Sequence, residues 1–160
     1  MPQRRTFPNG LTPAELAAAY RGELERFTAG LILEIRAVLA APPNPGETHA
    51  SVEVFPDEGT GRVAIGMYLH GLAPQLDDLT ASLGTSRNFS FGGSVRDMPR
   101  IDVFRYEQEV SIPDMTVDQI KAWFADCWRK AGGERFPLRV ELFGSQDYGD
   151  GRSIVLSEGR

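Results

Sequence analysis

The chain contains two histidines and one cysteine, the residue types that most often bind metals, transfer protons or act as nucleophiles. An imidazole can bind a metal or carry a proton near neutral pH, and a thiolate can attack an electrophile. His49 and His70 lack the paired spacing of zinc or iron ligands, and a metal site needs three or four converging side chains. No G-x-S-x-G turn places a nucleophile beside either imidazole. The sequence therefore predicts no metal site, no cofactor and no catalytic residue.

The cysteine, Cys127, lies within an aromatic stripe formed by Trp123, Phe124 and Trp128. Tryptophan is common at interface hot spots, so an exposed stripe would be a partner-binding ridge. The spacing of three and four residues favours the buried face of a helix instead. A reactive thiolate needs an exposed, electropositive setting, so we expect this thiol to be packed in the core and unreactive.

The segment from Asp147 to Glu158 has the outline of a calcium-binding loop. With Asp147 at position 1, Glu158 falls at position 12, where such loops carry a bidentate glutamate. Positions 3 and 5 are Gly149 and Gly151, which have no side-chain oxygen to offer a cation. We therefore predict a turn between two strands rather than a calcium site.

Acidic residues are unevenly distributed along the chain. Residues 42–80 hold six acids and one base, Arg62, and this excess equals the net charge of −5 for the whole chain. Such a field repels nucleic acids and anionic membranes and speeds encounter with a basic protein. The plainer interpretation is a solvated acidic surface.

The acidic region and the lack of a catalytic pattern lead to one main hypothesis. We predict a small acidic interaction domain that binds a basic protein partner and binds neither nucleic acid nor membrane; an immunity- or antitoxin-like inhibitor is an example. The residues predicted to bind the partner are Asp57, Glu58, Asp77 and Asp78.

Two other functions stay open at this point. A small-molecule-binding or enzymatic domain would hold its ligand in a pocket between sheet and helices, with His70 or Tyr106 as polar contacts. His70 also has a simpler interpretation as a strand end that is hydrogen-bonded to backbone or water. A homo-oligomer would use part of the aromatic helix or the segment 101–112 as a two-fold interface.

Two amphipathic helices are predicted to position these residues. Thr12, Pro13 and Glu15 form a helix start with a capping box, and apolar residues then recur every three or four positions until the prolines after Ala41. Thr116 to Gln119 forms a second capping box, and the aromatic stripe follows it until Gly132.

The strands are predicted from alternating apolar residues. Residues 50–55 and 62–69 read as a hairpin, because the glycines between them suit a tight connection. A short helix is expected over 72–83, with Gly84 after its end. The remaining expected strands are 87–91, 101–112, 138–142 and 154–156.

Together these elements predict an α+β fold with a single antiparallel sheet and two principal amphipathic helices packed on one face. The predicted order is α-β-β-(short α)-β-β-α-β-β. Residues 1–11 are expected to form an N-terminal arm, and residues 12–160 a single domain. One cysteine, no secretion signal and no long apolar run favour a cytoplasmic protein.

Overall fold

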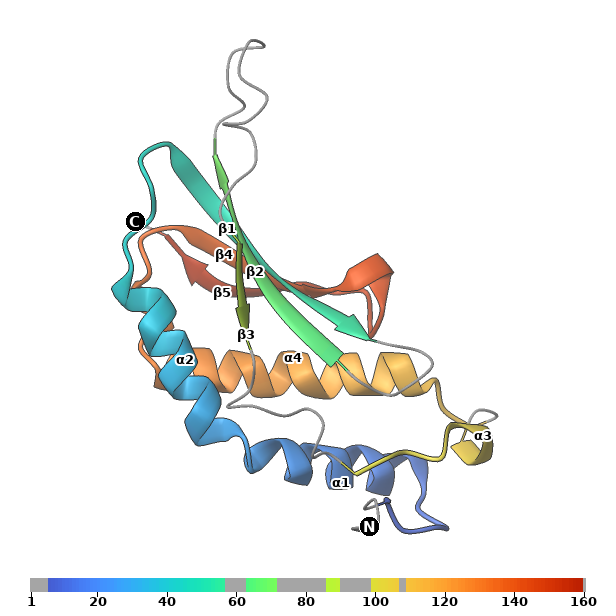
Figure 1. Ribbon diagram of the computed structural model, residues 1–160. Coiled ribbons are helices and arrows are strands. Elements are labelled where there is room, and N and C mark those ends of the chain that lie inside the picture. The colour runs from blue at the N-terminus through green and yellow to red at the C-terminus, as the bar shows by residue number, and fades with distance from the viewer. Residues whose placement is uncertain (1–5, 57–62, 72–85, 90–98, 107–108, 160) are drawn as a thin grey trace.

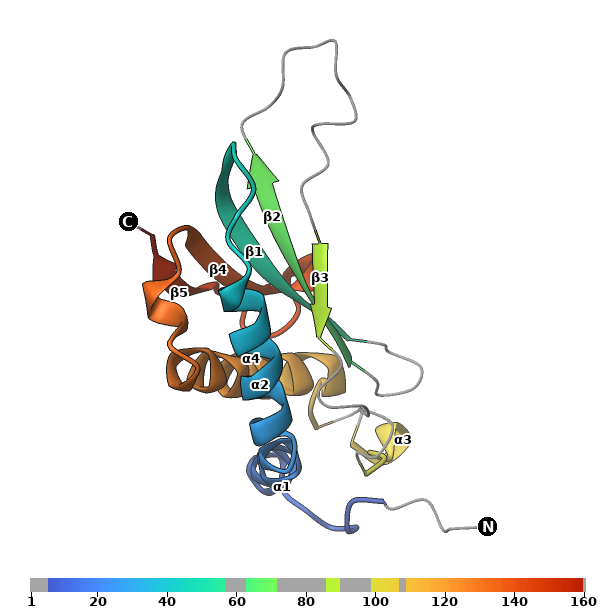
Figure 2. The same ribbon diagram turned by 60° about the vertical axis from the view of Figure 1, so that its left-hand side comes forward.

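The computed structural model describes residues 6–56, 63–71, 86–89, 99–106 and 109–159. In these parts of the chain, one five-stranded sheet has the main helices gathered on one of its sides (Figure 1, Figure 2). The α+β class predicted from the sequence is therefore confirmed.

The sheet has the strand order β3-β2-β1-β4-β5. β1 pairs antiparallel with β2, and β4 with β5, as the sequence predicted. β1 and β4 run parallel, so the prediction of a purely antiparallel sheet is wrong. Parallel neighbours need a long crossover, and here the crossover includes the helix α4. The strands are β1 (Glu47–Pro56), β2 (Val63–Gly71), β3 (Ser86–Phe89), β4 (Arg139–Gly144) and β5 (Ile154–Glu158).

The predicted first helix is two helices, α1 (Pro13–Glu25) and α2 (Thr28–Ala40). Its start is as predicted, because Thr12 and Glu15 form a reciprocal capping box. The chain leaves the helical path at Phe27, which has φ −102° and ψ 0°. The spacing of apolar residues passes through this break unchanged, so the sequence pattern gives no sign of it. The bend allows both helices to lie against α4 (Figure 1).

The strand predicted over residues 101–112 is wrong. Its first part contains the short helix α3 (Val103–Tyr106), and α4 (Ile112–Lys130) begins at its end. Ser111 is the N-cap of α4, since its hydroxyl accepts a hydrogen bond from the Asp114 amide. This cap starts the helix well before the predicted box at Thr116. Local capping overrides the strand preference of branched and aromatic residues here.

Two further expectations concern the segment after β2. The predicted strand at 87–91 corresponds to β3, which pairs antiparallel with β2. The predicted helix over 72–83 lies outside the described residues. The described residues also include two 3₁₀ turns, η2 (Gly133–Arg135) and η3 (Ser145–Asp147).

The core lies between α4 and the sheet. Trp123, Phe124, Cys127 and Trp128 are all buried, so the aromatic stripe packs inside the protein as predicted. The Phe124 ring meets the edge of Phe89 from β3, with centroids 5.2 Å apart. Burial raises the pKa of the Cys127 thiol to about 11, which keeps it protonated at neutral pH.

Residues 6–8 lie against the domain near α3. The Phe7 side chain is buried, and its amide donates to the carbonyl of Arg100 at 3.1 Å. The Tyr106 hydroxyl donates to the carbonyl of Pro8 at 3.2 Å. None of the helices in the described residues combines the length and hydropathy that a bilayer crossing requires.

Candidate functional site

The face of the sheet turned away from the helices is polar. Along β1, Val52 and Val54 are fully buried toward α4, whereas Ser51 and Glu53 are only half-buried. Successive side chains of a strand point to opposite faces, so Ser51 and Glu53 belong to the far face. We call this face the open face; it comprises His49, Ser51, Glu53, Phe55, Tyr68, His70, Arg139, Glu141 and Phe143.

The strand register brings these residues together in rows. His49 lies between His70 of β2 and Arg139 of β4. The next row along β1 is Ser51, between Tyr68 and Glu141. Each row joins residues that are far apart in the sequence.

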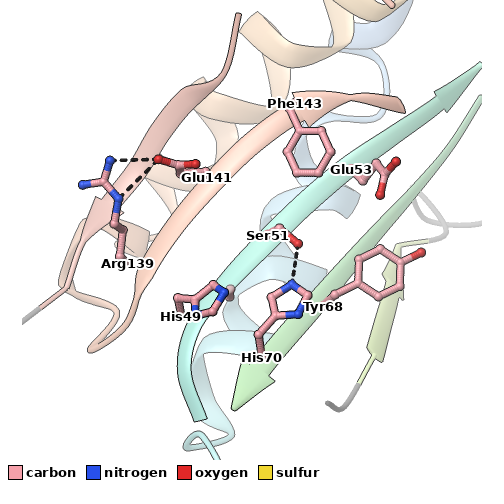
Figure 3. Close-up of a pocket in the computed structure, with 9 residues that line it drawn as sticks. His49, Ser51, Glu53, Tyr68, His70, Arg139, Glu141 and Phe143 are labelled. Carbon is pink, nitrogen blue, oxygen red and sulfur yellow. Dashed lines mark hydrogen bonds and ion pairs between the residues drawn. The ribbon is translucent and has the colours of Figure 1, made fainter. Parts of the chain in front are cut away.

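A third row ends the set with Glu53, between Gly66 and Phe143. All three rows line one open hollow of about 520 Å³ (Figure 3). That volume falls within the range of small-ligand pockets. A hollow of this volume has room for a small ligand or a protruding side chain.

The two histidines form a stacked pair at one end of the hollow. Their ring centroids are 4.8 Å apart and the ring planes differ by 23°. His70 Nε2 and Ser51 Oγ are hydrogen-bonded at 2.9 Å, and His49 Nδ1 and Thr48 Oγ1 at 3.0 Å. Burial, and the neighbouring His49 to a lesser degree, lower the pKa of His70 below its usual 6.5. His70 is thus held as a neutral imidazole at pH 7.

This lowered pKa predicts how stability depends on pH. As pH falls through 6.5, the unfolded chain takes up a proton at His70 before the folded chain does, so the folded state loses stability. We expect His70→Asn to lose less stability than the parent chain between pH 8 and pH 5.5. Urea unfolding midpoints at both pH values measure the difference, and an equal loss in the two proteins would contradict it.

A charged cluster occupies the β4 side of the open face. Arg139 donates to Glu141 and to Glu158 of β5, each at 2.8 Å. These two carboxylates raise the pKa of Arg139, which stays fully charged. Among the described residues that line the hollow, Arg139 is the one with a guanidinium or ammonium group, and two acids already engage it.

Glu53 differs from these acids because no hydrogen bond or ion pair joins its side chain to another described residue. Figure 3 shows its carboxylate near the rings of Phe143 and Tyr68. A half-buried carboxylate favours a cation, because desolvation without a partner costs free energy. The hollow thus presents negative charge beside aromatic surface.

The turn before β5 is fastened to α4. Lys121, although buried, donates to the Asp150 carboxylate at 2.5 Å and to the Arg152 carbonyl at 2.8 Å. The hydrogen bond from Lys121 lowers the pKa of Asp150. Asp114 and Asp118 accept from the amides of Gly149 and Asp150. Of the acids compared with calcium ligands, Glu158 is paired with Arg139. The described residues contain no cluster of three metal-ligating side chains.

The residues predicted from the sequence fall in three places. His70 lines the hollow, but on the face of the sheet opposite the helices, whereas the sequence placed a pocket between sheet and helices. Tyr106 is buried in α3, away from the hollow. The predicted partner-binding residues Asp57, Glu58, Asp77 and Asp78 lie outside the described residues.

Sequence reasoning missed the other residues of the open face. The available signal was the alternation in β1 and β4, where the polar partners of buried valines and leucines must share one face. What alternation cannot supply is the pairing of β1 with β4, which decides the neighbours. Comparisons with known protein families, with curated proteins and with solved structures found no match for this chain.

Proposed function

We propose that this chain is a protein-interaction domain whose open face binds a basic segment of a partner protein. The observation that carries the proposal is the open hollow, in which Glu53 has no cation partner among the described residues. The backbone of most interfaces moves little on binding, so we expect the open face to be a preformed surface. An immunity-type inhibitor of a basic protein would belong to this class.

Charge on the open face supports a basic partner. Glu53 and Glu141 of the open face, and Glu158 of β5 beside it, face one guanidinium among the described residues, that of Arg139. The neutral form of His70 adds no positive charge at pH 7. The chain as a whole carries a net charge of −5. Complementary charge raises association rates and weakens as salt rises.

The test removes the acids that neutralise Arg139. In Glu141→Gln/Glu158→Gln, an uncompensated guanidinium faces the incoming partner, and we expect the affinity for a basic partner to fall about tenfold or more. The partner is first recovered by capture on the tagged chain at low salt, and its affinity for each variant is then measured by calorimetry.

The matched control is Glu109→Gln/Glu134→Gln, which removes the same charge at two exposed positions that neither line the hollow nor pair with Arg139. This variant should bind as tightly as the parent chain. Equal affinities for all three proteins, or a captured partner that is acidic, would contradict the proposal.

A second candidate function is supported by the size of the hollow. About 520 Å³ is enough for a small molecule, and the Ser51–His70 pair offers polar contacts to it. A ligand screen that follows thermal unfolding separates the two functions. A small molecule that raises the midpoint of the parent chain, together with no protein captured at either low or high salt, would favour the second.

A further inference from the structure

Glu53 lies near two aromatic rings on the open face. Phe143 is its direct neighbour on β4, and adjacent strands lie about 4.8 Å apart. On the other side the neighbour is Gly66, which contributes no side chain, so Tyr68 is the next ring along β2. Figure 3 shows Glu53 beside both rings, and all three residues line the hollow.

The residue opposite Glu53 is Gly66, which is buried and adds no side chain to the open face. Any larger residue at Gly66 would project from the same face and stand beside the carboxylate. The Tyr68 ring is itself held in place by Phe55, which it meets edge-on at 6.4 Å. The Glu53 carboxylate therefore lines the hollow together with the aromatic side chains of Tyr68 and Phe143.

The charged and polar side chains described near Glu53 are bonded to other residues and not to its carboxylate. Arg139 lies two rows away from Glu53 on the sheet, and it is paired with Glu141 and Glu158. Ser51, in the row between, is hydrogen-bonded to His70. Within the described residues, Glu53 is therefore ready to accept hydrogen bonds from a ligand.

We propose that Glu53, Tyr68 and Phe143 form a subsite for one guanidinium group, that of an arginine side chain of the partner. The subsite rests on the proposed function and names the group that the open face recognises. A guanidinium is planar, so it can lie on an aromatic ring while its edge donates two hydrogen bonds to a carboxylate. An ammonium uses the same charge but lacks the planar contact. An anion is disfavoured because it would face an uncompensated carboxylate.

The experiment uses the full chain labelled with ¹⁵N and the blocked peptide acetyl-Gly-Arg-Gly-amide as probe. We expect amide shifts to gather at Ser51, Glu53, Gly66 and Phe143. The peptide with citrulline in place of arginine keeps the shape and removes the charge, and it should not bind. The lysine peptide should bind more weakly than the arginine peptide.

Two variants test the individual groups. Glu53→Gln should weaken binding of the arginine peptide about tenfold, and Tyr68→Leu about threefold to tenfold, because each removes one contact with the cation. Glu134→Gln, at an exposed position outside the hollow, is the matched control and should bind as the parent chain does.

The outcomes separate this subsite from the proposed function. The subsite would be overturned if the citrulline peptide bound as tightly as the arginine peptide, or if Glu53→Gln kept the full affinity for the arginine peptide. Tighter binding of the lysine peptide than of the arginine peptide would overturn the choice of a guanidinium. If the subsite fails while Glu141→Gln/Glu158→Gln still loses the basic partner, the interaction function stands without it. If both tests fail, both proposals fall.

Discussion

Phe124→Ala is expected to lower the free energy of unfolding by about 3–5 kcal/mol, because it removes a fully buried ring and leaves a cavity. The ring joins α4 to the sheet, since it contacts Phe89 of β3 and stacks on Trp128 at 6.2 Å. The surrounding aromatic rings are rigid, so they cannot close around the missing volume. Urea denaturation at pH 7 measures the loss.

The same substitution at an exposed ring is the control. Phe104 is 90% exposed in α3, so Phe104→Ala should change the free energy of unfolding by no more than about 0.5 kcal/mol. Similar losses at the two positions would mean that α4 does not pack on the sheet as described.

Gly144→Ala is expected to destabilise the protein by about 1–3 kcal/mol through overpacking. An added Cβ would overlap the backbone carbonyl oxygen of Tyr148 and come within 2.7 Å of Val117 Cγ1. A backbone oxygen cannot rotate away, so the turn before β5 must move. That turn is held to α4 by Asp114 and Asp118, and the movement would stretch these hydrogen bonds.

Gly22→Ala is the matched control for Gly144→Ala, and the expected sign is opposite. Gly22 lies inside α1 with no atom within 4 Å of an added Cβ. Alanine there restricts the unfolded chain and favours the helix, so the free energy of unfolding should rise by about 0.4–1 kcal/mol. A loss at both positions would remove the packing argument for Gly144.

The parts of the fold that depend on near neighbours were predictable from the sequence. The Thr12 capping box, the aromatic stripe of α4 and the hairpin of β1 and β2 each follow from residues a few positions apart. The break at Phe27 was not predictable, because the apolar period fits one long helix as well as two bent ones. Residues 101–112 were wrongly predicted as a strand, because β-branched and aromatic residues favour strands. The Ser111 cap instead sets the start of α4.

The candidate site was less predictable than the fold. Linear clustering of charge favoured Asp57, Glu58, Asp77 and Asp78, all of which lie outside the described residues. The hollow instead joins His49, Ser51 and Glu53 to a strand that comes after α4 in the sequence. Which residue of β4 faces Glu53 depends on a parallel register, and no local pattern encodes that register.

The central position of β1 has a consequence for how the chain is made. His49 pairs with Arg139 and Val54 with Gly144, so one edge of β1 has no partner until β4 has been synthesised. Until then the β1–β2 hairpin exposes unpaired backbone groups and the apolar residues Val52 and Val54. Contacts between such distant segments form slowly. Nascent chains that end before β4 are therefore expected to aggregate or to bind chaperones. In finished chains, β4 pairs with the exposed edge of β1.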